Sequence, residues 1–497
     1  MKICQITPWK PAGRLKSATS VTIARFALLL IAATASSGQT VRDVYNFTGQ
    51  NSSAIPSNVT PAQGRDGSLY GTTFGQGGTN YGTIFKLTTA GAFKQLYTFG
   101  STAGSQPNAG VTLASDGNFY GTAFSGGSSN EGVLFKITPS GTYTVLHDFA
   151  GGADGAGPAA APIVGTDGNL YGTTNGNPTT PSTIYKYTRF SGTFTTIYQF
   201  DQAHGQFVGA PLILATDGNL YGTAAQGGAA NCGTIFKITT SGTLLWYYSF
   251  PCTPGANPAG PLIQAADGNF YGTTSQGGNP GVGTVFKLNQ KGAVYVLYSF
   301  KGFYRGATDG STPLAGLVQA TDSKLYGAAS AGGTANQGTL FQITTSGTYK
   351  QLYSFTDAGS GPAAAPLQDT NGFLYGTTFQ GGTFNFGVVY SLNMNLGPFV
   401  ALVTYAGKAG STAQILGQGF IGTTNVAFNG VAASFTVVSD TYLRAVVPNG
   451  ATTGPVLVTT PSGALTSNKS FRIVGAAANA TRAKAGQPIS HAAKKTN

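Results

Sequence analysis

Apolar and polar residues alternate in short segments along most of the chain. In residues 293–300, for example, Val294, Val296, Tyr298 and Phe300 occupy every second position. A period of two places these side chains on one face of a β-strand, so the segment is predicted to be a strand with one packed face. Such segments are separated by Asp-Gly turns and glycine-rich loops, and this pattern predicts an all-β protein.

The predicted strands belong to a unit that occurs seven times. A tripeptide of Leu or Phe followed by Tyr-Gly recurs at spacings of 50, 51, 50, 50, 55 and 49 residues. In repeat 5, four antiparallel strands are predicted at residues 261–265, 269–274, 283–288 and 293–300. Seven four-stranded units predict a seven-bladed β-propeller, whereas a β-solenoid, the alternative, repeats at shorter periods. The tyrosines of repeats 1 to 7 are, in order, Tyr70, Tyr120, Tyr171, Tyr221, Tyr271, Tyr326 and Tyr375.

The two ends of the repeat array complement each other. Residues 41–48 match the fourth strand of the unit, but no first three strands precede them. Residues 365–392, in repeat 7, supply only three strands. The N-terminal strand is therefore expected to be the outer strand of the last blade, and the propeller is expected to extend over residues 41–396.

The N-terminal segment has the pattern of an export signal. An apolar run at residues 26–33 follows basic residues, and residues 33–35 (Ala-Thr-Ala) offer a small-x-small cleavage site. Residues 1–35 are therefore predicted to be a signal peptide, and the mature chain is expected to be secreted or on the cell surface, with no transmembrane segment. An uncleaved membrane anchor is the alternative, but the run is too short to span about 30 Å of hydrocarbon as a helix.

Cysteine usage agrees with export. Removal of the signal takes away Cys4 and leaves Cys232 and Cys252, both in repeat 4, in an oxidising compartment. A pair of cysteines in that compartment is predicted to form a disulfide. Two thiols without neighbouring histidines do not complete a zinc site, so no metal is expected. The histidines are scattered at His147, His204 and His491.

The net charge of +12 comes mainly from the two ends of the chain. Between residues 41 and 395, 14 Lys and Arg balance 14 Asp and Glu. Binding to nucleic acid needs a basic face, and the repeats offer none, so a nucleic-acid partner is not predicted. No stretch of about 18 apolar residues occurs, which excludes a polytopic membrane protein.

Recurring polar residues are interpreted as structural. The aspartate of each turn is expected to cap that turn rather than act as a catalytic acid or calcium ligand. These aspartates are Asp66, Asp116, Asp167, Asp217, Asp267 and Asp322. The lysines that follow Phe or Tyr are expected to project from outer-strand faces into water. They are Lys86, Lys136, Lys186, Lys237 and Lys287. The Tyr-Gly and Tyr-Ser-Phe aromatics are expected to form the core between blades. Because no Ser-His-Asp set, phosphate loop or HExxH element is present, neither catalysis nor a cofactor is predicted.

Candidate ligand-binding residues are large side chains in the loops that depart from the repeat. Tyr81, Phe384 and Phe386 lie in glycine-rich loops, whereas Phe207, Phe303, Tyr304 and Arg305 lie in connections between blades. Exposed aromatics beside Asn and Gly suit stacking against sugar rings, and Arg305 suits an acidic group. The alternative is that these side chains only plug the mouth of the propeller.

The chain changes pattern after residue 397. Short alternating strands separated by Gly and Pro turns indicate a small β-sandwich over residues 398–474. Residues 415–420 (Ile-Leu-Gly-Gln-Gly-Phe) and 428–430 (Phe-Asn-Gly) resemble an IPT/TIG domain, which implies an immunoglobulin-like fold. Residues 475–497 are Ala-rich and basic, and we expect a disordered tail without an anchoring helix.

The repeats resemble the GloVer tandem repeat of exported bacterial proteins. In repeat 4 the likeness is carried by residues 217–223 (DGNLYGT), 227–228 (GG), 233–237 (GTIFK) and 248–250 (YSF). Repeat 3 departs at residues 175–178 (NGNP), and repeat 6 departs at residues 322–324 (DSK). The resemblance implies a secreted or surface protein without an established activity.

We therefore expect an exported, non-catalytic protein that binds an unknown protein or glycan partner through the loop face of the propeller. A carbohydrate-binding or glycan-cleaving propeller and a structural cell-envelope protein are the alternatives.

Overall fold

The computed structural model describes residues 39–49, 54–56, 59–77, 80–177, 179–253, 255–302, 304, 307–356 and 359–474. The chain divides into a unit of residues 1–38 and a unit of residues 39–497, and the description concerns the second. The predicted signal peptide and the predicted C-terminal tail lie outside the described residues.

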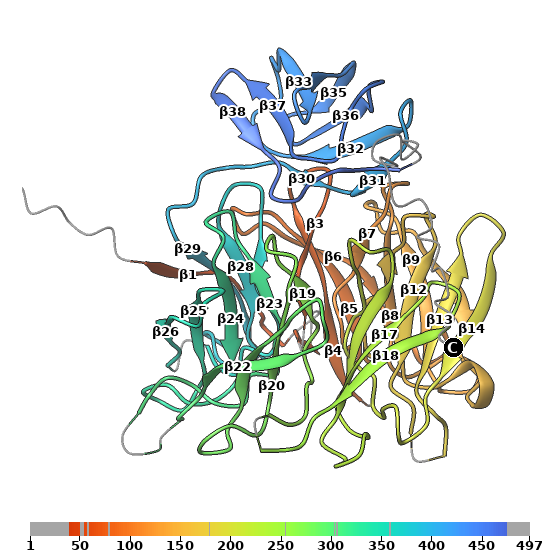
Figure 1. Cartoon of the computed structure of the whole chain (residues 1–497), viewed down its shortest axis with the longest axis vertical. Helices are drawn as coiled ribbons and strands as arrows, with labels where there is room; N and C mark the ends of the chain where they lie inside the picture. Colours follow the sequence, from red (N-terminus) through yellow and green to blue (C-terminus); the bar gives the residue numbers. More distant parts are fainter. Residues whose placement is uncertain are drawn as a thin grey trace, which may run out of the picture. The chain divides into compact units, whose positions relative to one another are not determined.

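The described part of the chain is an all-β protein with many four-stranded antiparallel sheets, as predicted (Figure 1). It includes two short 3-10 turns, η1 (Ser101–Ala103) and η2 (Gly152–Asp154). Each of the first six repeats forms a sheet whose strands pair in chain order. The strands of repeats 1 to 3 are β2 (Ala54–Ile55), β3 (Ala62–Gln63), β4 (Leu69–Gly77), β5 (Asn80–Leu87) and β6 (Phe93–Thr98), then β7 (Thr112–Leu113), β8 (Phe119–Ala123), β9 (Val133–Ile137) and β10 (Tyr143–Asp148), then β11 (Ile163–Val164), β12 (Leu170–Thr174), β13 (Thr183–Thr188) and β14 (Thr193–Gln199).

Repeats 4 to 6 follow the same pattern. Their strands are β15 (Ile213–Leu214), β16 (Leu220–Ala224), β17 (Thr234–Ile238) and β18 (Leu244–Ser249), then β19 (Ile263–Gln264), β20 (Phe270–Thr274), β21 (Thr284–Leu288) and β22 (Val294–Ser299), then β23 (Leu317–Gln319), β24 (Leu325–Ala329), β25 (Thr339–Ile343) and β26 (Tyr349–Ser354). In repeat 1, both β2 and β3 pair with β4, which makes a sheet of five strands.

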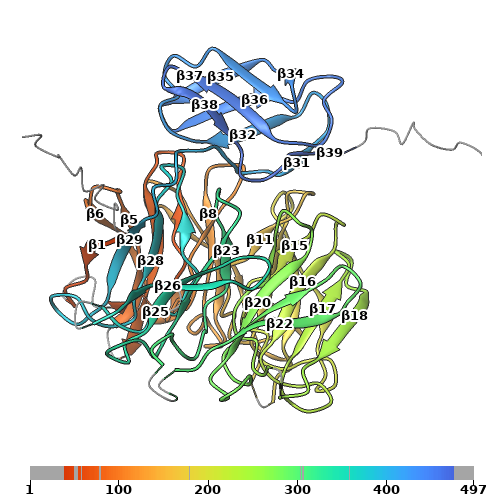
Figure 2. The ribbon, with the colours of Figure 1, turned by 60° about the vertical axis from the view of Figure 1, so that its left-hand side comes forward.

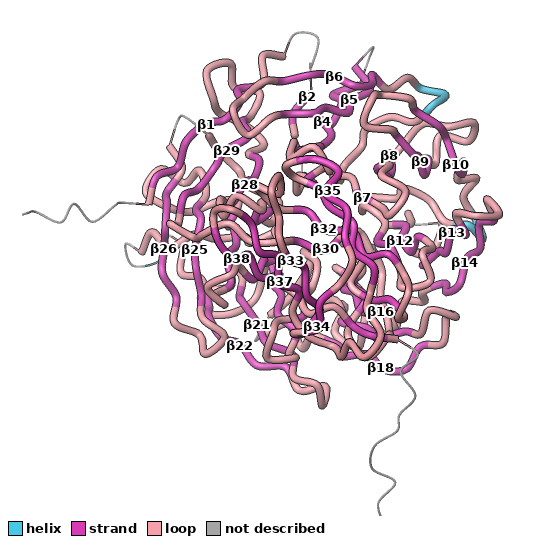
Figure 3. The backbone as a smooth tube through the Cα atoms, turned by 90° about the horizontal axis from the view of Figure 1, so that it is seen from above, coloured by secondary structure: helices cyan, strands magenta, loops and turns pink. Residues whose placement is uncertain are grey.

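The sheet of repeat 7 is assembled from both ends of the array. It contains β27 (Leu367–Gln368), β28 (Leu374–Thr377), β29 (Val388–Asn393) and the first strand of the described chain, β1 (Thr40–Asn46). Strand β1 pairs antiparallel with β29, from Thr40 opposite Asn393 to Asn46 opposite Val388. A hydrogen bond from the Thr377 hydroxyl to the Val59 carbonyl (2.8 Å) then joins repeat 7 to repeat 1. Figure 3 shows the sheets following one another around a common centre.

The same threonine position links most neighbouring repeats. The threonine that follows Tyr-Gly donates its hydroxyl proton to a backbone carbonyl just before the first strand of the next repeat. The pairs are Thr72 with Ala109, Thr122 with Ala160, Thr173 with Ala210, Thr223 with Gly260 and Thr273 with Ala315. Repeat 6 has Ala328 at this position. The Tyr-Gly-Thr motif therefore carries a contact between sheets as well as a strand.

Aromatic residues fill the space between adjacent sheets, as predicted. Tyr70 of repeat 1 stacks on Phe119 of repeat 2 with 4.1 Å between ring centroids, and both are buried in one cluster with residues of both sheets. The glycine after each tyrosine makes room for the aromatic ring of the third strand. A Cβ added at Gly272, for example, would lie 2.6 Å from the Phe286 ring. A larger residue there would displace the core.

The turn aspartates bind side chains of their surroundings, and the prediction that the lysines project into water was wrong for Lys86, Lys186, Lys237 and Lys287. Asp267 accepts a hydrogen bond from the Tyr271 hydroxyl (2.7 Å) and pairs with Lys287 (3.6 Å). Lys287 lies over the Tyr271 ring, 5.6 Å from its centroid, instead of projecting into water. Lys86, Lys186 and Lys237 pair with Asp66, Asp167 and Asp217 in the same way, whereas Asp116 pairs with Arg189 of the next repeat. The lysine stems cover tyrosine rings because those rings are the nearest apolar surface.

These contacts change the ionisation of the group. Burial alone would raise the pKa of Asp267, but hydrogen bonds from Tyr271 and Asn269 and the charge of Lys287 outweigh it and lower the pKa. Burial and the Asp267 carboxylate raise the pKa of Tyr271, so its hydroxyl remains a donor.

Removal of this hydroxyl tests the contact. Tyr271→Phe is expected to destabilise the protein by about 1 kcal/mol, because a hydrogen bond to a charged group is lost while water still reaches the carboxylate. The midpoint of urea unfolding measures the change, and Tyr247→Phe, at an exposed tyrosine, is the matched control. Equal midpoints for the two variants would show that the contact adds nothing.

The remaining strands lie after the repeats. Two antiparallel sheets of four strands, β30-β32-β36-β35 and β34-β33-β37-β38, are joined by a parallel pair, β31-β39. Both larger sheets contribute to one buried cluster, which includes Ile415, Leu443 and Val458. The strands are β30 (Ala401–Leu402), β31 (Ala406–Gly407), β32 (Thr412–Leu416), β33 (Asn425–Phe428), β34 (Val431–Ala432), β35 (Phe435–Ser439), β36 (Tyr442–Val446), β37 (Val456–Thr460), β38 (Gly463–Thr466) and β39 (Arg472–Ile473) (Figure 2).

Candidate binding site

A cavity runs along the centre of the repeats. It has a volume of about 320 Å³ and is lined by residues that precede or begin the first strand of every repeat. Most are small or apolar, among them Ala109, Gly209, Ala259 and Ala364. We call this space the central cavity.

The turns between first and second strands, at one end of the sheets, contact the C-terminal sheets. The Arg65 guanidinium donates to the Ser115 carbonyl (2.8 Å) and to the Gln414 side chain, and lies 4.6 Å from the centroid of the Tyr442 ring. Gln418 donates to the Thr370 hydroxyl of repeat 7 (2.9 Å). The turns of repeats 1, 2 and 7 therefore contact residues between 412 and 442, which cover part of this end of the sheets.

The opposite end is built on a repeated backbone frame. Each connection into repeats 2 to 7 has, at an equivalent position, a residue with a positive φ between 52° and 62°. We call these the connection residues, and they are Gln106, Gly157, Phe207, Asn257, Thr312 and Gly361. The carbonyl of each accepts a hydrogen bond from the first residue of the glycine-rich loop in its own repeat, as Phe207 does from the Ala225 N–H (3.2 Å). The backbone is thus the same in each repeat while the side chain changes.

Most connection residues are also fixed to the preceding repeat. The N–H groups of Gln106, Asn257 and Thr312 donate to the carbonyls of Tyr81, Cys232 and Val282 at 2.8 to 2.9 Å. A non-glycine residue with positive φ costs of order 1 kcal/mol or more and persists only where its surroundings hold it. The frame therefore presents varied side chains on a backbone with little freedom, which suits recognition.

A second cavity, which we call the mouth cavity, lies beside this frame. Its volume is about 340 Å³. Its lining residues are Asn108, Ala159, Asn175, Phe207, Gly209, Ala210, Ala225, Gln226, Pro258 and Ala259. Five of them also line the central cavity, namely Asn108, Ala159, Gly209, Ala210 and Ala259. None of the ten has a charged side chain, so the cavity combines one aromatic ring with three amides.

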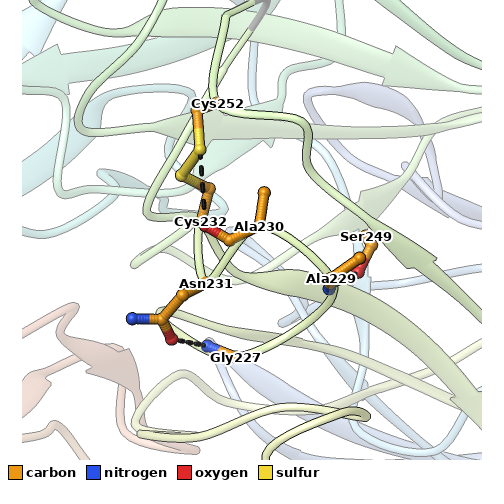
Figure 4. Close-up of a disulfide and its surroundings, with 7 residues drawn as sticks. All are labelled: Gly227, Ala229, Ala230, Asn231, Cys232, Ser249 and Cys252. Atoms are coloured by element: carbon orange, nitrogen blue, oxygen red, sulfur yellow. Dashed lines mark hydrogen bonds between the residues drawn. A yellow bond between two sulfur atoms is a disulfide. The ribbon is translucent and has the colours of Figure 1, made fainter.

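The disulfide between Cys232 and Cys252 is present, as predicted (Figure 4). Cys232 belongs to the glycine-rich loop that also contains Ala225 and Gln226, and Cys252 begins the connection that contains Pro258. The Asn231 side chain accepts a hydrogen bond from the Gly227 N–H (2.9 Å) within that loop (Figure 4). The bridge therefore joins two segments that each contribute residues to the lining of the mouth cavity.

Of the aromatic candidates from the sequence, Phe207 lines the mouth cavity. Tyr81 and Phe386 are half-buried and pack against core clusters. Tyr304 and Phe384 are exposed, and neither lines the two cavities. Phe303 and Arg305 lie outside the described residues. The structure therefore brings only Phe207 of this set to the site.

The amides of the site were missed because an Asn or Gln in a loop does not stand out from sequence alone. A usable signal existed at Asn175, which begins the departure of repeat 3 from the double-glycine pattern. Asn108 lies two residues after the connection residue Gln106. Other repeats have Ala, Gly or Leu at this position. Comparison of the repeats position by position would have found both.

Within the described ranges, no group of three or more His, Cys, Asp and Glu side chains is placed to hold a metal ion. Two histidines pair with aspartates, His147 with Asp154 (3.1 Å) and His204 with Asp201 (2.6 Å), and none of these four lines either cavity. Burial lowers the pKa of His147 despite its aspartate partner. No helix in the described part of the chain is long and apolar enough to span a bilayer.

A family model for the Gloeobacter/Verrucomicrobia repeat matches the sequence three times, at residues 30–216, 154–319 and 208–436. The chain belongs to this repeat family. The matches cover all seven Tyr-Gly motifs, so the repeat family accounts for the sheets and for the frame that surrounds both cavities. Among curated proteins, no significant match was found.

Solved structures similar to this member of the repeat family have low sequence identity. The extracellular domains of two hybrid two-component systems from B. thetaiotaomicron match at 10% and 14% identity, each with a TM-score of 0.46. They cover 85% and 84% of this chain, which spans 46% and 53% of theirs, about half their length. A periplasmic gluconolactonase from Pseudomonas aeruginosa matches at 18% identity with a TM-score of 0.42, over 65% of this chain and 96% of that chain.

Proposed function

We propose that this protein is an exported, non-catalytic binding protein whose ligand occupies the mouth cavity on the loop face of the repeats. The observation that carries the proposal is the frame of connection residues. Six positions share a positive φ of 52–62° and the same hydrogen bond, yet they carry amide, aromatic, hydroxyl and glycine side chains, and the aromatic one, Phe207, lines the cavity. Rigid loops with variable side chains around a cavity are the usual setting of a binding site.

The proposal includes a seven-bladed propeller closed by β1, followed by an immunoglobulin-like sandwich at residues 398–474. Seven separate sheets, the pairing of β1 with β29 and the Thr377 hydrogen bond to Val59 support the closed ring. The two four-stranded sheets that share one buried cluster support the sandwich. Contacts of its residues with several turns leave the loop face as the ligand side.

Export and the non-catalytic character rest on separate observations. The Cys232–Cys252 disulfide supports an oxidising compartment, and the balance of charges over residues 41–395 disfavours a nucleic-acid partner. Hydrolysis of a glycoside would need two carboxyl groups about 5–10 Å apart around the substrate, and the lining of the two cavities contains no carboxylate. The turn aspartates are held by tyrosine hydroxyls instead.

The test is a binding screen with the secreted full-length protein against glycans, peptides and extracellular proteins. A ligand of the mouth cavity is expected to lose at least about tenfold in affinity in Phe207→Ala, because aromatic side chains in pockets dominate binding. Phe190→Ala is the matched control, since Phe190 is fully exposed in the turn between β13 and β14. Ligands that bind both variants equally would contradict the site, and chemical conversion of a bound ligand would contradict the non-catalytic assignment.

A further inference from the structure

We propose that the mouth cavity binds a neutral carbohydrate, through the Phe207 ring and the amides of Asn175 and Gln226. This assignment rests on the proposed function and names the class of its ligand. All three residues line the cavity of about 340 Å³, and they come from two adjacent repeats. The cavity is at the small end of ligand pockets, which range over about 300–1,000 Å³, and so suits a short oligosaccharide segment.

The polar groups of the cavity match vicinal hydroxyls. A planar side-chain amide has two N–H donors and one acceptor oxygen close together. Each sugar hydroxyl can donate one hydrogen bond and accept others, so an amide can bind two neighbouring hydroxyls. Asn175 begins the loop of repeat 3 and Gln226 lies within the glycine-rich loop of repeat 4, and hydrogen bonds between backbone groups fix the chain at both places. The Asn175 N–H, for example, donates to the Gly157 carbonyl (3.0 Å). The backbone that carries the amides is therefore fixed before a ligand arrives, which lowers the entropy cost of binding.

The Phe207 ring supplies the apolar part of the site. Its backbone has φ 57°, a conformation that bulky residues rarely adopt, and its side chain is half-buried beside the amides. The other connection residues, Gln106, Gly157, Asn257, Thr312 and Gly361, are polar or glycine. A pyranose ring has one face of C–H groups that packs against an aromatic face, while its hydroxyls point sideways. Phe207 therefore provides an aromatic surface at a position where the other repeats have a polar residue or glycine.

The electrostatics of the cavity select an uncharged ligand. No lining residue is charged, and the aspartates of nearby connections are already paired, as Asp201 is with His204 and Asp154 is with His147. An acidic or basic ligand would lose hydration at this site without gaining an opposite charge, which weakens its binding. A neutral polyol loses little, because amides replace its water hydrogen bonds. A protein partner would ordinarily bury a larger patch with charges at its rim.

The experiment titrates the secreted full-length protein with hexasaccharides of β-1,4-glucan, β-1,4-mannan, β-1,4-xylan and α-1,4-glucan, and with oligogalacturonate as the acidic probe. At least one neutral series is expected to bind, and Phe207→Ala and Asn175→Ala are expected to weaken it by at least about tenfold. Phe190→Ala is expected to leave the affinity unchanged, and Phe207→Tyr is expected to retain most of it. Because no ion pair forms, affinity is expected to stay within about twofold when salt rises from about 50 to about 500 mM.

The outcomes separate this assignment from the proposed function. Folding of each variant is checked by its circular dichroism spectrum and thermal midpoint. If no neutral oligosaccharide binds, but oligogalacturonate or an extracellular protein binds and is lost in Phe207→Ala, the mouth cavity remains a binding site and the carbohydrate assignment falls. If neutral oligosaccharides bind equally to Phe207→Ala and Phe190→Ala, the assignment of sugar to this cavity falls. If no probe of any class binds, both proposals fall.

Discussion

Replacing Asp369 with alanine is expected to stabilise the protein above neutral pH and to leave it nearly unchanged near pH 4. Asp369 is fully buried in repeat 7, its only hydrogen-bond donor is the Asn371 N–H (3.0 Å), and its Oδ2 atom has no partner. Burial raises the pKa of this carboxyl to about 7, because no charged group offsets the loss of hydration. The equivalent residues of repeats 1 to 6 are Gly64, Ala114, Gly165, Ala215, Ala265 and Ala320, so alanine fits this position.

The sign follows from proton binding. Between pH 4 and 7 the folded state keeps the Asp369 proton while the unfolded state, with an ordinary pKa of 3.8, has lost it. Stability therefore falls as pH rises through this window, and the full loss is present above about pH 7. A shift of this size corresponds to roughly 4 kcal/mol at the high-pH end. Asp369→Ala is expected to remove this slope.

Urea unfolding midpoints at pH 4, 6 and 8 measure the effect. Asp267→Asn is the control of opposite sign, because Lys287, Tyr271 and Asn269 lower the pKa of Asp267. Loss of the Asp267 carboxylate is expected to destabilise the protein above pH 4. The expected effect is small because this carboxyl is about one-third exposed. A difference between wild type and Asp369→Ala that is the same at all three pH values would contradict titration of Asp369 in this range.

The regular part of the fold was accessible from the sequence because its signals are local. Alternation with a period of two, Asp-Gly turns and the Tyr-Gly motif locate the strands that the structure contains. Partners across the sheets were not accessible in the same way. Lys287 follows Phe286 at a position that alternation assigns to the outside, but the turn aspartate of the same repeat lies within 3.6 Å. The register of β20 and β21, which the sequence does not state, places Lys287 opposite Tyr271. Because the Tyr271 hydroxyl binds Asp267, this register also brings Lys287 close to the Asp267 carboxylate.

The site was less accessible, for a physical reason. Large aromatics attract attention in a glycine-rich sequence, but exposure alone does not place them in a cavity, as Tyr304 and Phe384 illustrate. Phe207 is the connection residue that lines the mouth cavity, and the positive φ of its backbone has no residue signature other than glycine. Phe207 was found because it departs from the repeat, and Gln226 was missed because it does not: Gln276 and Gln380 recur in its place in repeats 5 and 7.

Loss of the disulfide is expected to destabilise the protein by about 3 kcal/mol. The bridge links two cysteines 20 residues apart in the sequence. Without the bridge the unfolded chain gains conformational entropy, and for a loop of this length that gain lowers the free energy of unfolding by about 3 kcal/mol. The effect has a local component as well. The Cys232 carbonyl accepts the Asn257 N–H (2.9 Å), and the Ala229 N–H donates to the Ser249 hydroxyl (2.8 Å), so the bridged loop is connected to both the frame and its own sheet.

The double variant Cys232→Ser/Cys252→Ser tests both components. Its thermal midpoint is expected to fall by several degrees, and amide exchange is expected to rise in residues 225–233 and 251–259 more than elsewhere. Treatment of the wild type with a reductant should reproduce these changes, whereas the same reductant should not affect the double variant. Faster exchange spread evenly over all repeats would contradict a local role for the bridge. Faster exchange confined to the two bridged segments would mean that the disulfide holds the mouth cavity in its binding geometry, because Gln226 and Pro258 lie on the segments that it joins.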